Sequence, residues 1–332
     1  MNDTSGTRPV TVDWSEGSIP PHWLVSGGLL LVVSLAVVGF YWATVLSLLD
    51  AWGSSRTYAH GYLVIPAAGY LVWCYRERLF TIVPRANVWG LLSLLMVEGL
   101  WIVGKMFSLV ALQQAAIVCV FPCLVLTILG QEVARTVSWP MGFLLFMLPY
   151  GTSIEPWLQA WTAAVIVGGL SVLGIPHRYD TFQITVPSGI WEVAPDCGGL
   201  RYLLPGLALG YAFSILAYRS PWRRAGFLIL CGTMLMLANG LRAFAVILGD
   251  HLGIAVGTDH RVFSYSVYGM TIPLLYWIGN KWVDGGIDGA PPRRSASGCG
   301  QYEFGKAIMA AMAAVAVLAV APSVVWWWAD RP

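Results

Sequence analysis

Long apolar runs alternate with short polar loops along almost the whole chain. Ten runs can be traced, roughly at 24–49, 61–75, 88–104, 106–129, 139–152, 157–174, 200–218, 225–247, 262–280 and 306–328. Runs of this kind predict helices that cross a bilayer, since a crossing needs about 20 apolar residues. The run 139–152 is short and contains two prolines, so we interpret 139–174 as one crossing plus a helix in or near the outer leaflet. The pattern predicts an all-α polytopic membrane protein with about nine transmembrane helices.

The composition supports this class of protein. Hydrophobic residues make up 57% of the 332 residues and charged residues only 11%, whereas soluble domains carry about a quarter charged residues. The net charge of +2 is spread over short loops, which argues against a nucleic-acid partner. We expect a cytoplasmic tail (1–23), a membrane domain (24–281), a cytoplasmic linker (282–305) and an additional C-terminal transmembrane helix (306–332).

Positive residues in four loops set the predicted orientation. By the positive-inside rule the cytoplasmic loops are those that hold Arg76, Arg78 and Arg85; Arg135; Arg219, Arg223 and Arg224; and Lys281, Arg293 and Arg294. Residues 177–194 alternate apolar and polar side chains around a Pro-Ser-Gly turn, which predicts a short extracytoplasmic β-hairpin. With this orientation four residues reach the extracytoplasmic face: His60, Cys197, Arg242 and His260.

Cys197 has the sequence context of a nucleophile. A proline and an aspartate precede it, so the thiol is expected at or just before a helix N-terminus, where the helix dipole favours a thiolate. Arg201, four residues later, adds a positive charge on the same helical face. Gly198 and Gly199 are expected to let a substrate backbone approach closely. The alternative is a structural cysteine in a glycine-rich packing site, and we favour the nucleophile.

Arg242 lies inside an otherwise apolar run, where an arginine is costly and indicates function. Asn239, three residues earlier, could help to hold its orientation. The alternatives are an arginine that snorkels to the outer interface, or a structural partner of Asp250 or Glu192.

His260 follows Asp259 just before the ninth run, as expected for a general base whose neighbour fixes its tautomer. The alternative is a capping histidine exposed to water. His251 lies in the same loop, and the residues alone do not choose between the two. His60, in Tyr-Ala-His-Gly-Tyr, is interpreted as a positioning or packing residue.

The other five cysteines are expected to be structural: Cys74, Cys119, Cys123, Cys231 and Cys299. Cys119 and Cys123 are four residues apart, but they lie in an apolar helix without an accompanying histidine, so no metal site is predicted. No disulfide framework and no cofactor are predicted.

Four stretches, in this order, resemble the exosortase/archaeosortase family of membrane cysteine transpeptidases. They are Ala59-His60-Gly61 with Leu71-Val72-Trp73 and Arg76; Cys197-Gly198-Gly199-Leu200-Arg201; Asn239-Gly240-Leu241-Arg242; and Asp259-His260-Arg261-Val262-Phe263. The resemblance covers roughly residues 20–280, and the order of the stretches is more specific than any one of them. Gly198 replaces the usual serine of the family, and Ser264-Tyr265 stand where Gly-Trp is common.

The resemblance implies a fold, a reaction and a set of partners. Cys197 would be the nucleophile, Arg242 the stabiliser of the oxyanion or thiolate, and His260, rather than His251, the acid/base. The substrates would be exported proteins with a C-terminal motif (PEP-CTERM-like), a transmembrane helix and a basic tail, cleaved at the extracytoplasmic face of the bacterial inner membrane. Transfer to an unknown acceptor would follow, with membrane lipids as the other partner, no nucleic acid and no cofactor.

Two other functions remain open from the sequence. In a polytopic transporter, Arg242, Glu98 and Lys105 would be charges along the substrate pathway. In a membrane scaffold the cluster would carry no chemistry.

Overall fold

The computed structural model describes residues 20–253, 260–284, 306, 309–315 and 317–318. The chain divides into two compact units, each assembled from separate stretches of sequence. Unit 1 takes in residues 1–45, 72–141 and 290–332, and unit 2 takes in 46–71 and 142–289. The expected tail 1–23 and linker 282–305 fall almost entirely outside the described residues, as does much of the expected C-terminal helix.

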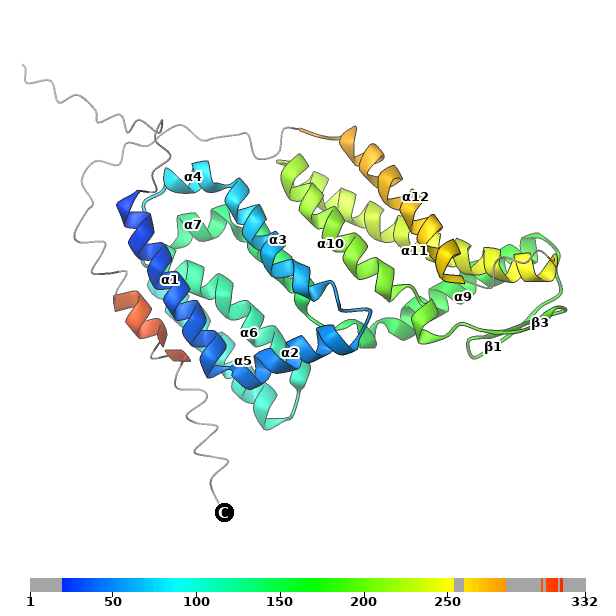
Figure 1. Ribbon diagram of the computed structural model, residues 1–332, viewed down its shortest axis with the longest axis horizontal. Helices are drawn as coiled ribbons and strands as arrows, with labels where there is room; N and C mark the ends of the chain where they lie inside the picture. Colours follow the sequence, from blue (N-terminus) through cyan, green and yellow to red (C-terminus); the bar gives the residue numbers. More distant parts are fainter. Residues whose placement is uncertain (1–19, 254–259, 285–305, 307–308, 316, 319–332) are drawn as a thin grey trace, which may run out of the picture. The chain divides into compact units, whose positions relative to one another are not determined.

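Unit 1 is helical. Its elements are α1 (Pro21–Phe40), α4 (Arg76–Phe80), α5 (Val88–Met106), α6 (Val110–Leu124), a π-helical segment (Val125–Leu129), α7 (Gln131–Thr136) and most of α8 (Ser138–Gly142). Two further helices, α2 (Trp42–Ser54) and α3 (Gly61–Cys74), contribute residues to both units. Within unit 1, α5 and α6 pack against each other along their lengths (Figure 1).

The first apolar run is not one helix, because the chain breaks at Tyr41 between α1 and α2. The Tyr41 side chain is buried, and its hydroxyl lies between the carboxyl group of Glu98 and the backbone carbonyl of Leu318, 2.8 Å away. Glu98 is itself buried in α5, with 4% of its surface exposed. The contact between the hydroxyl and the carboxyl group offsets part of the free-energy cost of burying these two polar groups.

Unit 2 contains a helical hairpin, a third long helix and a small sheet. Its elements are three 3₁₀ turns (Phe143–Met147, Gly151–Ser153 and Pro195–Cys197), α9 (Glu155–Val172), β1 (Arg178–Asp180), β2 (Gln183–Val186), β3 (Gly189–Glu192), α10 (Leu200–Ala217), α11 (Pro221–His251) and α12 (His260–Asn280). Figure 1 shows α10, α11 and α12 side by side, and α11 also packs on α9.

The sheet extends the predicted hairpin by one strand. The strands are antiparallel in the order β1-β2-β3, with Arg178 opposite Thr185 and Gln183 opposite Glu192. β2 alternates exposed and buried side chains, so Ile184 and Val186 face inward. They join an apolar cluster with residues of α9 and α11, and the side chain of Cys197 packs against this cluster.

The hairpin α10–α11 and the end of α12 meet at one end of unit 2. Tyr218, just after α10, donates its hydroxyl hydrogen to the carbonyl of Gly279 at 2.7 Å. The Arg219 amide donates to Asp284 Oδ1, also at 2.7 Å, and the Arg223 guanidinium lies 3.5 Å from the same carboxylate. These contacts fix the N-terminus of α11 beside the C-terminus of α12.

Among the described residues, five helices are long and apolar enough to cross a membrane. They are Pro21–Phe40, Val88–Met106, Val110–Leu129, Leu200–Ala217 and Pro221–His251. Gly61–Cys74 and Ser138–Met147 are shorter apolar helices, and α9 and α12 have 18 and 21 residues. The multi-pass membrane class is therefore confirmed, whereas the number of about nine crossings stays a prediction.

Candidate active site

Helix lengths bring Cys197, Arg242 and the start of α12 to the same end of unit 2. At about 1.5 Å per residue, the 18 residues of α10 span about 27 Å, and Arg242 lies about 31 Å along α11 from Pro221. The 21 residues of α12 rise about 30 Å from the end where Gly279 accepts from Tyr218. Each length matches the bilayer core of about 30 Å. The two residues and the start of α12 thus lie about one bilayer thickness from the arginine-rich turn.

Cys197 ends a 3₁₀ turn just before α10 begins. Its amide donates to the carbonyl of Ala194 at 2.8 Å, and the thiol is half-buried. Gly199 then adopts a φ of +90°, in the left-handed region that favours glycine, and α10 starts at Leu200. The predicted position of Cys197 beside a helix N-terminus is confirmed.

The structure shows a packing reason for the two glycines. A Cβ added to Gly199 would lie 2.6 Å from Cγ of Asn239, and one added to Gly198 would lie 3.2 Å from the carbonyl oxygen of Pro195. A side chain at either position would therefore meet neighbouring residues of the chain, and the expected close approach of a substrate backbone stays a prediction. At Gly199 the absence of a side chain allows the amide of Asn239 to approach the Cys197 turn.

Asn239 makes the central contacts of the site. Its Nδ2 donates to the carbonyl oxygen of Cys197 at 2.9 Å and to Oγ1 of Thr162 at 3.0 Å. Its Oδ1 accepts a hydrogen bond from the hydroxyl of Tyr268 at 3.1 Å. An amide has two N–H donors, and both are used here. The side chain therefore joins α9, the Cys197 turn and α12 to α11, and only 2% of it is exposed.

Sequence reasoning missed Thr162, Gln159 and Tyr268. Thr162 is fully buried, and Gln159, one turn before it, donates from Nε2 to the carbonyl of Val193 at 2.8 Å. Two buried polar side chains three residues apart in the apolar run of α9 are the signal that could have found this face. Tyr268 is 6% exposed and lies in the middle of an apolar run rich in aromatic residues, so its sequence carries no comparable signal.

Two arginines and two tyrosines surround this network. Arg242 lies one helical turn after Asn239 and is 9% exposed. The rings of Tyr202 and Tyr268 stack with centroids 3.9 Å apart and planes 17° apart. The guanidinium of Arg201 lies 5.2 Å from the centroid of Tyr202. Both arginines therefore lie near the stacked tyrosines, one of which binds Asn239.

His60 has a different environment, at the turn that precedes α3. Its Nδ1 lies 3.1 Å from the carbonyl of Thr57 and its Nε2 3.0 Å from the carbonyl of Phe146. Burial lowers the pKa of His60 below 6.5, although the two carbonyls oppose this shift. Nearby, the Trp52 indole donates to the carbonyl of Met147 at 2.8 Å. These contacts are those of a residue that holds the α2–α3 turn on the segment before α9.

The remaining predicted residues are only partly placed. α12 begins at His260, but the side chain of His260 and the whole of Asp259 lie outside the described residues. His251 is the last residue of α11, nine residues beyond Arg242. The choice of His260 as the acid/base therefore stays a prediction.

Comparison with known protein families identifies the family of the chain. The model of the transmembrane exosortase family matches residues 52–277, which include all the site residues described above. No curated protein and no solved structure matches the chain.

Proposed function

Because the chain belongs to the transmembrane exosortase family, a family of membrane protein-sorting peptidases, we propose that it cleaves the C-terminal sorting signals of exported proteins. Cys197 is the nucleophile of this proposal, Arg242 the oxyanion stabiliser and His260 the acid/base. The substrate ends in a short motif, a transmembrane helix and a basic tail. The scissile bond lies at the extracytoplasmic interface, between the motif and the helix.

One observation carries the proposal: Asn239 ties the Cys197 turn to the helix that holds Arg242. The hydrogen bond from Nδ2 to the Cys197 carbonyl fixes the peptide that carries the thiol. Arg242 follows one turn later on α11, so the same helix positions the thiol and a positive charge. A nucleophile and an oxyanion stabiliser must be held in this way before the substrate arrives, because preorganisation is the source of the electrostatic stabilisation.

The reaction proceeds in two halves. The thiolate of Cys197 attacks the scissile carbonyl carbon, and the carbonyl oxygen gains negative charge beside Arg242. The C–N bond then breaks as His260 gives a proton to the leaving amine, which leaves a thioester on Cys197. In the second half, the now neutral His260 takes a proton from an acceptor amine or from water as this acceptor attacks the thioester carbonyl, and the C–S bond breaks to restore the Cys197 thiolate and the protonated histidine. Transfer to an acceptor is the outcome typical of the family.

A substrate with two epitope tags tests the proposal. One tag precedes the C-terminal motif of an exported protein from the same organism, and the other follows its basic tail. Cells with the wild-type chain should separate the tags, and cells with Cys197→Ala or Cys197→Ser should keep them joined at equal membrane levels of the enzyme. A hydroxyl is a much weaker nucleophile than a thiol without a dedicated base. Tag separation by Cys197→Ala would refute the nucleophile assignment.

The other cysteines supply the matched controls. Replacement of any one of them by alanine should leave tag separation intact: Cys74, Cys119, Cys123, Cys231 or Cys299. Cys231 is the most demanding of these controls, because its Sγ fills the space beside Gly210 and only 1% of the residue is exposed. If the chain were a transporter or a scaffold, separation of the tags would not depend on the Cys197 thiol. The same experiment therefore distinguishes these functions from a peptidase.

A further inference from the structure

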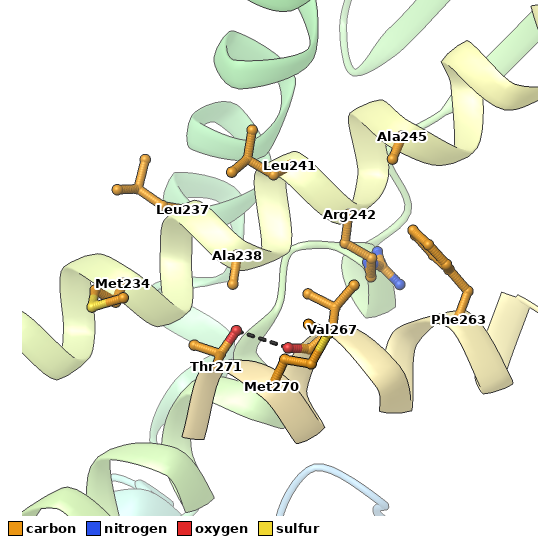
Figure 2. Close-up of a pocket in the computed structure, with 10 residues that line it drawn as sticks. All are labelled: Met234, Leu237, Ala238, Leu241, Arg242, Ala245, Phe263, Val267, Met270 and Thr271. Carbon is orange, nitrogen blue, oxygen red and sulfur yellow. Dashed lines mark hydrogen bonds between the residues drawn. The ribbon is translucent and has the colours of Figure 1, made fainter. Parts of the chain in front are cut away.

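A groove of about 510 Å³ lies between α11 and α12, in the same unit as Cys197 (Figure 2). Its walls are apolar side chains from Met234 to Ala245 on α11 and from Phe263 to Thr271 on α12. Thr271 donates its hydroxyl hydrogen to the carbonyl of Val267 at 2.8 Å, so its hydroxyl is already bonded within α12. Figure 2 shows the side chain of Arg242 pointing from α11 toward Phe263 and Val267. Arg242 thus contributes to both the groove and the candidate active site.

The lining residues follow the spacing of a helix–helix seam. Met234, Ala238, Leu241 and Ala245 on α11 are separated by four, three and four residues. Phe263, Val267 and Met270 on α12 repeat the first two of these steps. Such stripes accept the side chains of a neighbouring helix. Of the two small residues, which lie two turns apart, Ala238 is buried and Ala245 is half-buried, so Ala245 permits close approach of another backbone at the outer end of the groove, as is usual between helices in a membrane.

Among the described residues, the stripes are only partly covered: Ala238 is buried at the floor of the groove, whereas one residue on each rim is open. Leu241 is 57% exposed and Met270 is 76% exposed, although both belong to helices that we place in the bilayer. The groove therefore opens toward the membrane and can receive a helix from it.

The position of the groove along α11 sets how far into the bilayer an occupant reaches. Arg242 lies about 31 Å from the cytoplasmic start of α11, at the outer edge of the bilayer core. Met234 lies eight residues closer to that start, about 12 Å deeper in the membrane. An occupant must therefore be apolar for about two helical turns, and its outer end lies beside Arg242.

We propose that this groove binds the first two turns of the substrate's transmembrane helix, with the scissile peptide bond just outside them at Arg242. This inference rests on the proposed function and assigns a binding site to its substrate. The helix after the cleavage site begins at the outer interface, so its apolar turns fit the stripes while the preceding carbonyl reaches Arg242. Docking of the helix would in this way select the bond that Cys197 attacks.

Photocrosslinking from the groove tests this assignment on the full chain. The inactive Cys197→Ala variant carries p-benzoylphenylalanine at Leu241 or at Met270, and the partner is the two-tag substrate. Both positions should crosslink to the first two turns of the substrate helix. Ile229 is the control, because it is 71% exposed on α11 but lies about 140–180° around the helix from Met234 and Ala238, at about 100° per residue. It should give at least tenfold less of this product.

A second variant tests whether the groove is needed for cleavage. Ala245→Trp should fill the outer end of the groove and lower the cleavage rate at least tenfold, and Ile229→Trp should not. Alkylation of Cys197 by a small reagent should proceed equally in both variants, which reports an intact site. If Ala245→Trp fails to fold, the crosslinking result decides.

The outcomes separate this inference from the proposed function. Cleavage by Cys197→Ala would refute the peptidase assignment itself. Cleavage that needs Cys197, with equal crosslinks from Leu241, Met270 and Ile229, would refute only the groove. Crosslinks to lipid alone, or to a second copy of the chain, would also overturn the substrate-helix assignment.

Discussion

The hydroxyl of Tyr268 donates to Oδ1 of Asn239 at 3.1 Å, and this bond determines which way the Asn239 amide faces. With Oδ1 toward Tyr268, both N–H groups point to acceptors, at the Cys197 carbonyl and the Thr162 hydroxyl. The opposite orientation would set Oδ1 against the Cys197 carbonyl and leave two acceptors facing each other. Tyr268 thus acts on Cys197 through Asn239, as a positioning residue.

Tyr268→Phe should therefore slow cleavage without weakening substrate binding. The substitution leaves a buried acceptor without its donor, which costs about 1–3 kcal/mol, or roughly 5- to 150-fold in rate if it all falls on the transition state. We expect kcat to fall and KM to stay within about twofold, measured with purified enzyme and a tagged substrate peptide.

Two further variants test this interpretation of Tyr268→Phe. Asn239→Asp should lose more activity, because a carboxylate cannot donate to the Cys197 carbonyl. Tyr276→Phe is the matched control, since Tyr276 lies two turns later on α12 and its ring packs edge-on against Phe213, with centroids 5.0 Å apart. An equal loss from Tyr276→Phe would show a general effect on helix packing instead of a positioning role.

The orientation of the chain gives the second prediction. Ile190 on β3 is 72% exposed, and a single cysteine there, in a chain without its natural cysteines, should react with an impermeant maleimide on intact cells. Single cysteines at Arg78 and Arg223 should react only after the cells are opened, because the positive-inside rule predicts that their arginine-rich loops face the cytoplasm. Arg224 is unsuitable as a probe, since it is buried and donates to the Tyr218 carbonyl at 2.9 Å. Labelling of position 223 on intact cells would invert the topology.

Local patterns explain what the sequence could predict. The alternation at Ile184 and Val186 identified β2 because one face of that strand is buried. β1 gave no such signal, because Arg178, Tyr179 and Asp180 are all exposed. The break at Tyr41 lies inside an uninterrupted apolar run, so hydropathy alone could not locate it.

The contacts of the site were harder to predict than its residues. Cys197, Asn239 and Arg242 carry recognisable motifs, whereas the partners of Asn239 come from α9 and α12, 77 and 29 residues away in the chain. Periodicity describes one helix at a time and does not say which polar side chains meet across helices. For the same reason, the close approach of Asn239 to Gly199 could not be predicted from either helix alone.

His60 gives a prediction about pH. Its pKa lies below 6.5 because burial disfavours the charged ring, so below about pH 6.5 the unfolded chain binds more protons than the folded one. The contribution of His60 to the free energy of unfolding is therefore fully present above pH 6.5, and it decreases as the pH falls below that value. The apparent Tm of the detergent-solubilised protein should decrease from pH 7.5 to pH 5.5, and His60→Gln should reduce the slope. An unchanged slope in the variant would assign the effect to other groups.

The last prediction concerns the division of roles between Arg242 and the two candidate histidines. Arg242→Lys keeps the charge but loses the planar pair of donors, so stabilisation of the oxyanion should suffer although the local field survives. We expect a loss of about 2–4 kcal/mol of transition-state stabilisation, the range for one oxyanion donor. His260→Ala should block proton transfer to the leaving amine, with slow accumulation of thioester, and His251→Ala should be close to wild type. The rate of tag separation in the three variants is the measurement. If His251→Ala is inactive and His260→Ala is active, the acid/base is His251, nine residues upstream at the end of α11. The start of α12 would then have been matched to the wrong part of the family motif.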